Sequence, residues 1–186
     1  IKLFSNSSYR YCLNDISNYL NISFEEILKR ATIKDTLTEE KIWNKKERKT
    51  IADYRNYYSE NKHYLERQDY YNLNHIPILR EFRNLNINSN VLDYGCGTAY
   101  LAVEAKIKRN DLNIYLADIS EALTKKFVFW RFKRKKLSFT WIDIPTNEEL
   151  NINASFDLIR CHDVFEHSFY PLKIIKFFHK KLNHNG

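Results

Sequence analysis

The sequence lacks the cysteine patterns of zinc-binding proteins and the long apolar runs of membrane-spanning proteins. Its three cysteines, Cys12, Cys96 and Cys161, lie far apart and form neither a C-x-x-C pair nor a zinc-binding pattern. Free thiols in a reducing compartment are therefore expected. No apolar run approaches the roughly 18 residues that a membrane-spanning helix needs, and the first residues show no signal-peptide pattern. These absences predict a cytoplasmic protein with no membrane partner.

Glycine and proline are also scarce, with three of each, and methionine is absent. The remaining composition, with 44% hydrophobic and 28% charged residues, is that of an ordinary globular chain. A length of 186 residues is enough to bury a core. The net charge of +7 fits either solubility or an anionic partner and does not decide between them.

The first part of the chain, residues 1–86, has the patterns of helices. Helical segments are predicted over residues 15–20, after a capping box at 23–26, from residue 38 through Tyr58, and over residues 69–85 with a kink or break at Pro77. A polar connector at residues 86–90 is the best internal boundary. We interpret residues 1–86 as a helical cap or lid region ahead of a second region, residues 87–186.

In residues 87–186 short apolar runs alternate with helix-like stretches. Strands are predicted at residues 90–94, 113–117, 138–142 and 156–161, and helices at 99–108, 120–136 and 171–182. Strand–helix alternation of this kind favours a parallel sheet joined by crossover helices. The predicted fold class is therefore α/β, with a Rossmann-like, mostly parallel sheet and flanking helices, preceded by an α-helical N-terminal region.

Two of the three glycines, Gly95 and Gly97, end the first predicted strand. Glycines at this point let the chain turn sharply into a helix and let a ligand approach the backbone closely. The helix expected to start near Thr98 would then direct its free amide groups at that ligand. A dinucleotide fingerprint would need glycine at position 100, which is Tyr100. The pattern indicates a nucleotide-like ligand other than a dinucleotide.

The segment Asp93-x-Gly95-x-Gly97-x-Ala99 resembles motif I of class I S-adenosylmethionine-dependent methyltransferases. The strand at 113–117 continues to Asp118, the third strand to Asp143, and residues 155–167 resemble the family's fourth-strand block. Together the four motifs imply that S-adenosylmethionine is the cofactor. The resemblance assigns cofactor contacts to Asp93, Tyr94, Gly95, Cys96, Gly97, Asp118, Ile119, Asp143, Ile144 and His162.

Each acid has an implied role in that family. The acid of motif I lies near the cofactor's amino group, while the glycine turn accommodates the methionine part. The acid after the second strand accepts hydrogen bonds from both ribose hydroxyls. The acid after the third strand contacts the adenine amino group.

The candidates for acid–base work follow the fourth strand, where the methyl group is expected. His162, Glu166 and His167 are the predicted catalytic residues, with Asp163 beside them. In the family, Glu166 and His167 also shape the loop and the start of the next helix. Direct catalysis and this shaping role both remain open, and no metal ion is predicted.

The resemblance leaves the methyl acceptor open, and a small molecule is the favoured class. An RNA acceptor is an alternative, because Asp163-x-x-Glu166-His167 resembles the metal-binding segment of Hen-type small-RNA 2′-O-methyltransferases when read at helical spacing. The basic and aromatic run at residues 127–136 could form an RNA-facing surface or a solvated helix face. A non-catalytic, cofactor-binding scaffold is the third hypothesis.

Two further expectations follow from the family pattern. Tyrosines between residues 54 and 71 suit a helical lid over the cofactor and the acceptor, although core packing explains them equally well. A complete domain of this family has seven strands, and only four are found before the chain ends at Gly186. We therefore expect the sequence to be a fragment of a longer protein.

Overall fold

The alternation of strands and helices after residue 86 produces a parallel sheet. The computed structural model describes residues 7–32, 49–60, 64–72 and 80–183. Its strands are β1 (Asn90–Tyr94), β2 (Asn113–Ile119), β3 (Thr140–Ile144) and β4 (Leu158–Cys161). They lie in the order β3-β2-β1-β4, and every neighbouring pair is parallel. The strand order reverses between β1 and β4, and such a switch point is where open α/β sheets bind ligands.

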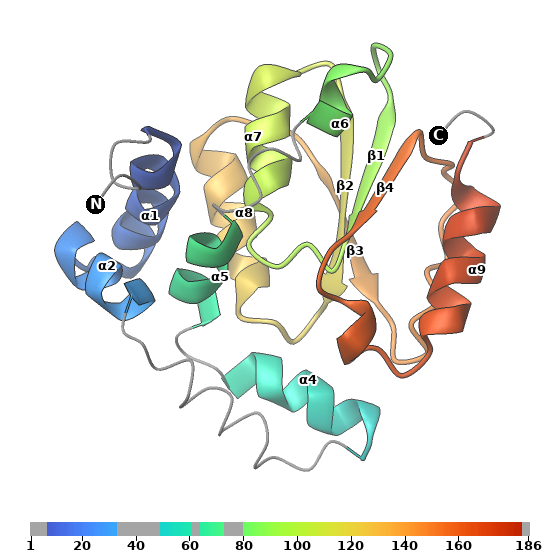
Figure 1. Ribbon diagram of the computed structural model, residues 1–186, viewed down its shortest axis with the longest axis horizontal. Coiled ribbons are helices and arrows are strands. Elements are labelled where there is room, and N and C mark those ends of the chain that lie inside the picture. Colours follow the sequence, from blue (N-terminus) through green and yellow to red (C-terminus); the bar gives the residue numbers. More distant parts are fainter. Residues whose placement is uncertain (1–6, 33–48, 61–63, 73–79, 184–186) are drawn as a thin grey trace.

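The helices of this region cover both faces of the sheet (Figure 1). The crossover helices are α7 (Tyr100–Lys108) and α8 (Thr124–Arg134), while α9 (Pro171–Lys181) follows a 3₁₀ turn, η3 (Phe165–His167). Side chains of β1 alternate between the two layers, so that Val91 packs with α7 and α8 and Leu92 packs with Ile174 and Phe177 of α9. The predicted α/β fold with a parallel, Rossmann-like sheet is confirmed.

The N-terminal region is helical where the structure describes it. Its helices are α1 (Ser7–Leu20), α2 (Phe24–Thr32), α4 (Ile51–Glu60), α5 (Tyr64–Asn72) and α6 (Arg80–Arg83). The capping box is present, because the backbone amide of Glu26 donates to Ser23 Oγ at 3.2 Å. Figure 1 shows α1, α2 and α5 beside α7 and α8, and α4 across the end of the sheet where the strands terminate. No helix among the described residues is long and apolar enough to cross a membrane.

Some helix boundaries differ from the prediction. Helix α1 begins at Ser7 and not at residue 15, and the helix predicted to begin at residue 69 begins at Tyr64. Leu65 is buried in the core, so tertiary packing of the residues before 69 extends this helix beyond the polar pattern. Pro77 and the predicted helix start at residue 38 lie outside the described residues.

A buried cluster of charged groups joins the N-terminal helices to the α/β region. The guanidinium of Arg131 on α8 is fully buried and pairs with Asp69 of α5 and, at 3.2 Å, with Asp15 of α1. Arg131 Nη1 also donates to the Thr98 carbonyl at 3.0 Å. Burial raises the pKa of Asp69, and the neighbouring Arg131 opposes that rise. One cation therefore fixes three segments that are far apart in the sequence.

Removal of Asp69 tests this junction. We expect Asp69→Ala to lower the free energy of unfolding by about 3–5 kcal/mol, because a buried guanidinium would lose one of its compensating carboxylates. Urea denaturation followed by circular dichroism measures the change. The control is Glu25→Ala on the exposed face of α2, which should cost less than about 0.5 kcal/mol. A loss below 1 kcal/mol for Asp69→Ala would contradict the proposed role of the cluster.

Candidate active site

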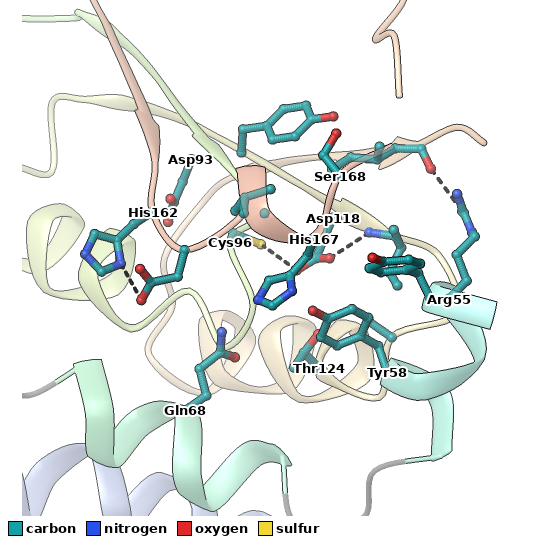
Figure 2. Close-up of a pocket in the computed structure, with 18 of the residues that line it drawn as sticks. Arg55, Tyr58, Gln68, Asp93, Cys96, Asp118, Thr124, His162, His167 and Ser168 are labelled. Atoms are coloured by element: carbon teal, nitrogen blue, oxygen red, sulfur yellow. Dashed lines mark hydrogen bonds and ion pairs between the residues drawn. The ribbon is translucent and has the colours of Figure 1, made fainter. Parts of the chain in front are cut away.

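A cavity of about 470 Å³ opens at the carboxyl ends of β1, β2 and β4. This size lies within the range of small-molecule sites, roughly 300–1,000 Å³. One wall of the cavity comes from the sheet and its loops, and the other comes from helices α4 and α5 of the N-terminal region. Figure 2 shows side chains of both sides directed into the same space.

The glycine turn after β1 forms the floor of the cavity. Gly95 has φ +69°, and a Cβ atom there would lie 2.4 Å from Val164 Cγ2, so both the backbone conformation and the close packing require glycine. The amides of Gly95 and Cys96 donate to the Ala117 carbonyl at 2.7 and 3.1 Å. The turn is thereby tied to the end of β2.

The two backbone amides just before the helix have protein acceptors. The Gly97 amide donates to Asp118 Oδ2 at 2.7 Å, and the Thr98 amide donates to Gln68 Oε1 at 2.9 Å. Helix α7 begins at Tyr100, two residues after the expected start near Thr98, and Ala99 before it has a left-handed conformation with φ +53°. That the first amides of this helix point at the ligand stays a prediction. A side chain from α5 covers this part of the turn.

Asp118 is the acid at the centre of the site. Its Oδ2 accepts from Gly97 and its Oδ1 accepts from the Ile119 amide at 2.7 Å. Burial raises the pKa of Asp118 to about 6, although both amide hydrogen bonds oppose the rise. The Cys96 thiol is a third, weak donor, 3.9 Å from Oδ2. A carboxylate has about four acceptor positions, so Asp118 keeps at least one for a donor from a ligand. Its side chain lines the cavity.

Asp93 is held differently. Its Oδ1 lies 2.8 Å from Arg160 Nη1, and both side chains are almost fully buried. The parallel register places Asp93 opposite Arg160 on β4, so the sheet itself brings the pair together. The sequence analysis did not identify Arg160, although an arginine inside an apolar strand was a signal that a buried acid lies nearby. The cavity wall at this point is close to charge-neutral.

Most of the predicted cofactor residues line the cavity, and two do not. Those that do are Asp93, Tyr94, Gly95, Cys96, Asp118, Ile119, Ile144 and His162. Gly97 lies behind Gln68, and Asp143 is half-exposed outside the cavity. The carboxylate of Asp143 instead pairs with Lys125 Nζ at 2.6 Å and accepts from Trp141 Nε1 at 2.8 Å. The structure thus does not bring Asp143 to the cavity wall, because its partners Lys125 and Trp141 hold the carboxylate outside the cavity.

Tyrosines of the N-terminal helices form the opposite wall. Tyr54, Tyr57, Tyr58 and Tyr64 all line the cavity. The ring of Tyr58 packs edge-on against Tyr57 and Tyr64, and its centroid lies 6.1 Å from that of His167. Burial raises the pKa of Tyr58, so its hydroxyl stays protonated at neutral pH. The side chains of Tyr70 and Tyr71 lie outside the described residues.

Arg55 fastens α4 over this end of the sheet. Its guanidinium pairs with Glu121 at 2.8 Å and donates to the Ile144 carbonyl at 3.0 Å. The helix is therefore tied both to the loop after β2 and to the end of β3. These contacts close the cavity from the side of the N-terminal region.

The candidate acid–base residues follow β4. His162 Nδ1 lies 3.0 Å from Asp163 Oδ2, and His167 Nε2 lies 4.0 Å from Glu166 Oε1. Both histidines line the cavity, whereas Glu166 is more than half exposed and does not. Asp163 has φ +53° and precedes the three-residue turn η3, so the helical spacing assumed for a metal site is wrong. Among the described residues, no group of three potential ligands could hold a metal ion.

Comparisons with known proteins agree with this geometry. A family described as "Methyltransferase domain" matches residues 51–186. The chain belongs to this family. No curated protein sequence matches the chain.

Solved structures similar to this chain include those of three proteins. PigF with SAH is 14% identical, covers 75% of this chain and 43% of that chain, and has a TM-score of 0.52. An O-methyltransferase family protein from Burkholderia thailandensis is 10% identical, covers 68% of this chain and 40% of that chain, and has a TM-score of 0.50. PKMT2 from Rickettsia typhi in complex with AdoHcy matches with 20% identity, 53% and 20% coverage, and a TM-score of 0.48. This chain thus spans less than half the length of each of these proteins.

The family confirms the predicted class of cofactor, S-adenosylmethionine, and the cavity has groups that fit it. Asp118 keeps at least one free acceptor position of the kind that ribose hydroxyls need. Two buried polar atoms at the cavity wall, Thr124 Oγ1 and Arg160 Nε, have no partner among the residues that the structure describes. Unpaired buried polar groups are costly, so a polar ligand in this cavity would satisfy them. Asp118 and Thr124 would face the cofactor from the side of β2.

The raised pKa of Asp118 predicts how cofactor binding depends on pH. In the predicted contact, ribose hydroxyls would donate to the ionised carboxylate. With a pKa of about 6, only about a tenth of the domain carries that charge at pH 5. We expect the Kd of S-adenosylhomocysteine to rise about tenfold from pH 7 to pH 5. Isothermal titration calorimetry at several pH values measures it. Asp118→Asn should bind weakly at both pH values, and a pH profile unchanged by this substitution would contradict the assignment.

Proposed function

We propose that this chain forms the cofactor half of an S-adenosylmethionine-dependent methyltransferase that modifies a small-molecule acceptor. The observation that carries the proposal is the shared cavity. Asp118 and the glycine turn lie on one wall, tyrosines of α4 and α5 lie on the other, and His167 of the loop after β4 packs against Tyr58 of the tyrosine wall. A cofactor on the first wall and an acceptor on the second would be enclosed together under α4 and α5.

Enclosure supports a small acceptor over a macromolecule. Arg55 and the aromatic contacts of Tyr54 with Phe169, at 5.1 Å between ring centroids, hold α4 against the loop after β4. A cavity of about 470 Å³ beneath such a cover has room for the cofactor and a compact acceptor. The tyrosine rings offer a flat apolar surface with polar edges, which suits an acceptor with both characters.

In methyl transfer, the protein positions the acceptor and accepts its proton. The cofactor supplies an electrophilic methyl group on its sulfonium, so the chain's residues need only hold the acceptor in line and exclude water. His167 is our candidate for the base, because its ring lines the cavity and packs against Tyr58 of the lid. Its neighbour Glu166 is more than half exposed, and Glu166 Oε1 lies 4.0 Å from His167 Nε2.

The described structure gives the RNA alternative little support. Arg131 and two aromatic residues of the basic run, Phe127 and Phe132, are fully buried. Arg131 is committed to Asp69 and Asp15, so these three side chains serve the core of the fold and offer no surface to a nucleic acid. The remaining hypothesis is a non-catalytic scaffold, which binding experiments must exclude.

Cofactor binding and acceptor class can be tested together. We expect S-adenosylhomocysteine to bind the chain at micromolar concentration, and Asp118→Ala to weaken binding at least tenfold because the ribose hydroxyls lose their acceptor. With methyl-labelled S-adenosylmethionine and a fractionated cell extract, label should enter the small-molecule fraction. Label found only in the RNA or protein fraction would overturn the small-acceptor proposal, and absence of binding would favour a scaffold.

Substitution of His167 separates chemistry from binding. We expect His167→Ala to lower kcat/KM for the labelled acceptor about 10²–10⁴-fold, as loss of a general base does. The Kd for S-adenosylhomocysteine should change less than threefold, since His167 faces the acceptor side. His162→Ala is the matched control among the two cavity histidines. An equal loss of activity for both variants would show that neither is a specific base.

A further inference from the structure

A glutamine from the N-terminal region lies directly over the glycine turn. Gln68 belongs to α5, and its terminal amide reaches the space above Gly97, where an added Cβ would lie 2.0 Å from Gln68 Nε2. Figure 2 shows the side chain extending from α5 toward the turn at Cys96. Gln68 lines the cavity, whereas Gly97 behind it does not. A ligand that lies along the glycine turn therefore meets Gln68 before it meets Gly97.

The orientation of this amide is determined by its partner. The Thr98 backbone amide is a donor and lies 2.9 Å from Gln68 Oε1, so the oxygen must face Thr98. The Nε2 group then lies over Gly97 with two hydrogens, and it donates to no residue in the described parts of the chain. At this part of the turn, the hydrogen-bond donor that faces the cavity is thus the Gln68 side chain and not the backbone.

The backbone of α5 holds this donor in place. The next residue, Asp69, is fully buried in the ion pair with Arg131, and Arg131 also contacts the Thr98 carbonyl. The same cation therefore anchors both the helix that carries Gln68 and the turn that Gln68 covers. A donor fixed in this way loses little conformational entropy when it binds a ligand.

We propose that Gln68 Nε2 binds the carboxylate of the cofactor's amino-acid part. This inference rests on the proposed function, because it needs the cofactor in this cavity. Asp118 would bind the ribose, and the amino-acid part would then extend along the glycine turn to Gln68. The cofactor site is consequently completed by the N-terminal region, and α5 is a part of the site and not only a cover.

Two probes isolate the carboxylate. S-adenosylhomocysteine has the amino-acid part, and 5′-methylthioadenosine has the same nucleoside and thioether without it. Gln68→Glu keeps an oxygen for the Thr98 amide but replaces the donor with a negative charge. We expect this variant to raise the Kd of S-adenosylhomocysteine tenfold or more and that of 5′-methylthioadenosine less than twofold.

Further variants make the test decisive. Gln68→Ala removes the donor without adding charge, so it should weaken S-adenosylhomocysteine about three- to tenfold and leave 5′-methylthioadenosine unchanged. Asp118→Asn, which alters the ribose contact, should weaken both probes. If Gln68→Glu and Gln68→Ala affect the two probes equally, or neither, the inference is wrong. If the unmodified chain binds neither probe while its circular dichroism is that of a folded protein, the proposed function itself fails.

Discussion

The buried guanidinium of Arg131 constrains the arrangement of the whole molecule. A charge in the interior is stable only when carboxylates and carbonyls surround it, and here they come from α1, α5 and the turn that precedes α7. Because these segments are far apart in the sequence, the cation can be satisfied only if the N-terminal helices pack against α8. That packing places Gln68, next to Asp69, over the glycine turn. The position of the lid and the composition of the site thus depend on one charged core residue.

Two buried acids at the site show how the same chemical group obtains different properties. Asp93 is neutralised by Arg160 from the adjacent strand, so the wall near it carries little net charge. Asp118 has two backbone amides and the Cys96 thiol as partners and no cation paired with it in the described part of the chain, and burial raises its pKa to about 6. A group that titrates there can gain its full charge when ligand hydroxyls approach. The second acid is therefore the one whose affinity for a ligand should respond to pH.

Sequence patterns predicted the sheet well because each strand carries its own signal. The apolar runs at 90–94 and 113–117 became β1 and the first part of β2, and the acid after the second run lies at the cavity as its position after a strand implied. The prediction was weaker where function depends on contacts between distant segments. Gln68, Arg55 and Arg160 carry no local motif, and their roles follow from packing of α4, α5 and β4 against the switch point. Asp143 is the opposite case. It lies at the end of the third strand as predicted, but its partners Lys125 and Trp141 hold its carboxylate outside the cavity.

The sequence by itself determined the α/β class, the glycine turn and the family, because periodicity and short motifs are local properties that survive without any knowledge of the fold. It also placed Asp93, Asp118 and His162 of the site at the ends of strands, where a parallel sheet gathers them at one edge. Only the tertiary structure decided which donors face the cavity. The amides of Gly97 and Thr98 looked free from their position in the chain, yet Asp118 and Gln68 occupy them. Hydrogen bonds between residues 21 and 30 positions apart depend on how helices and strands pack, and no local pattern encodes that packing.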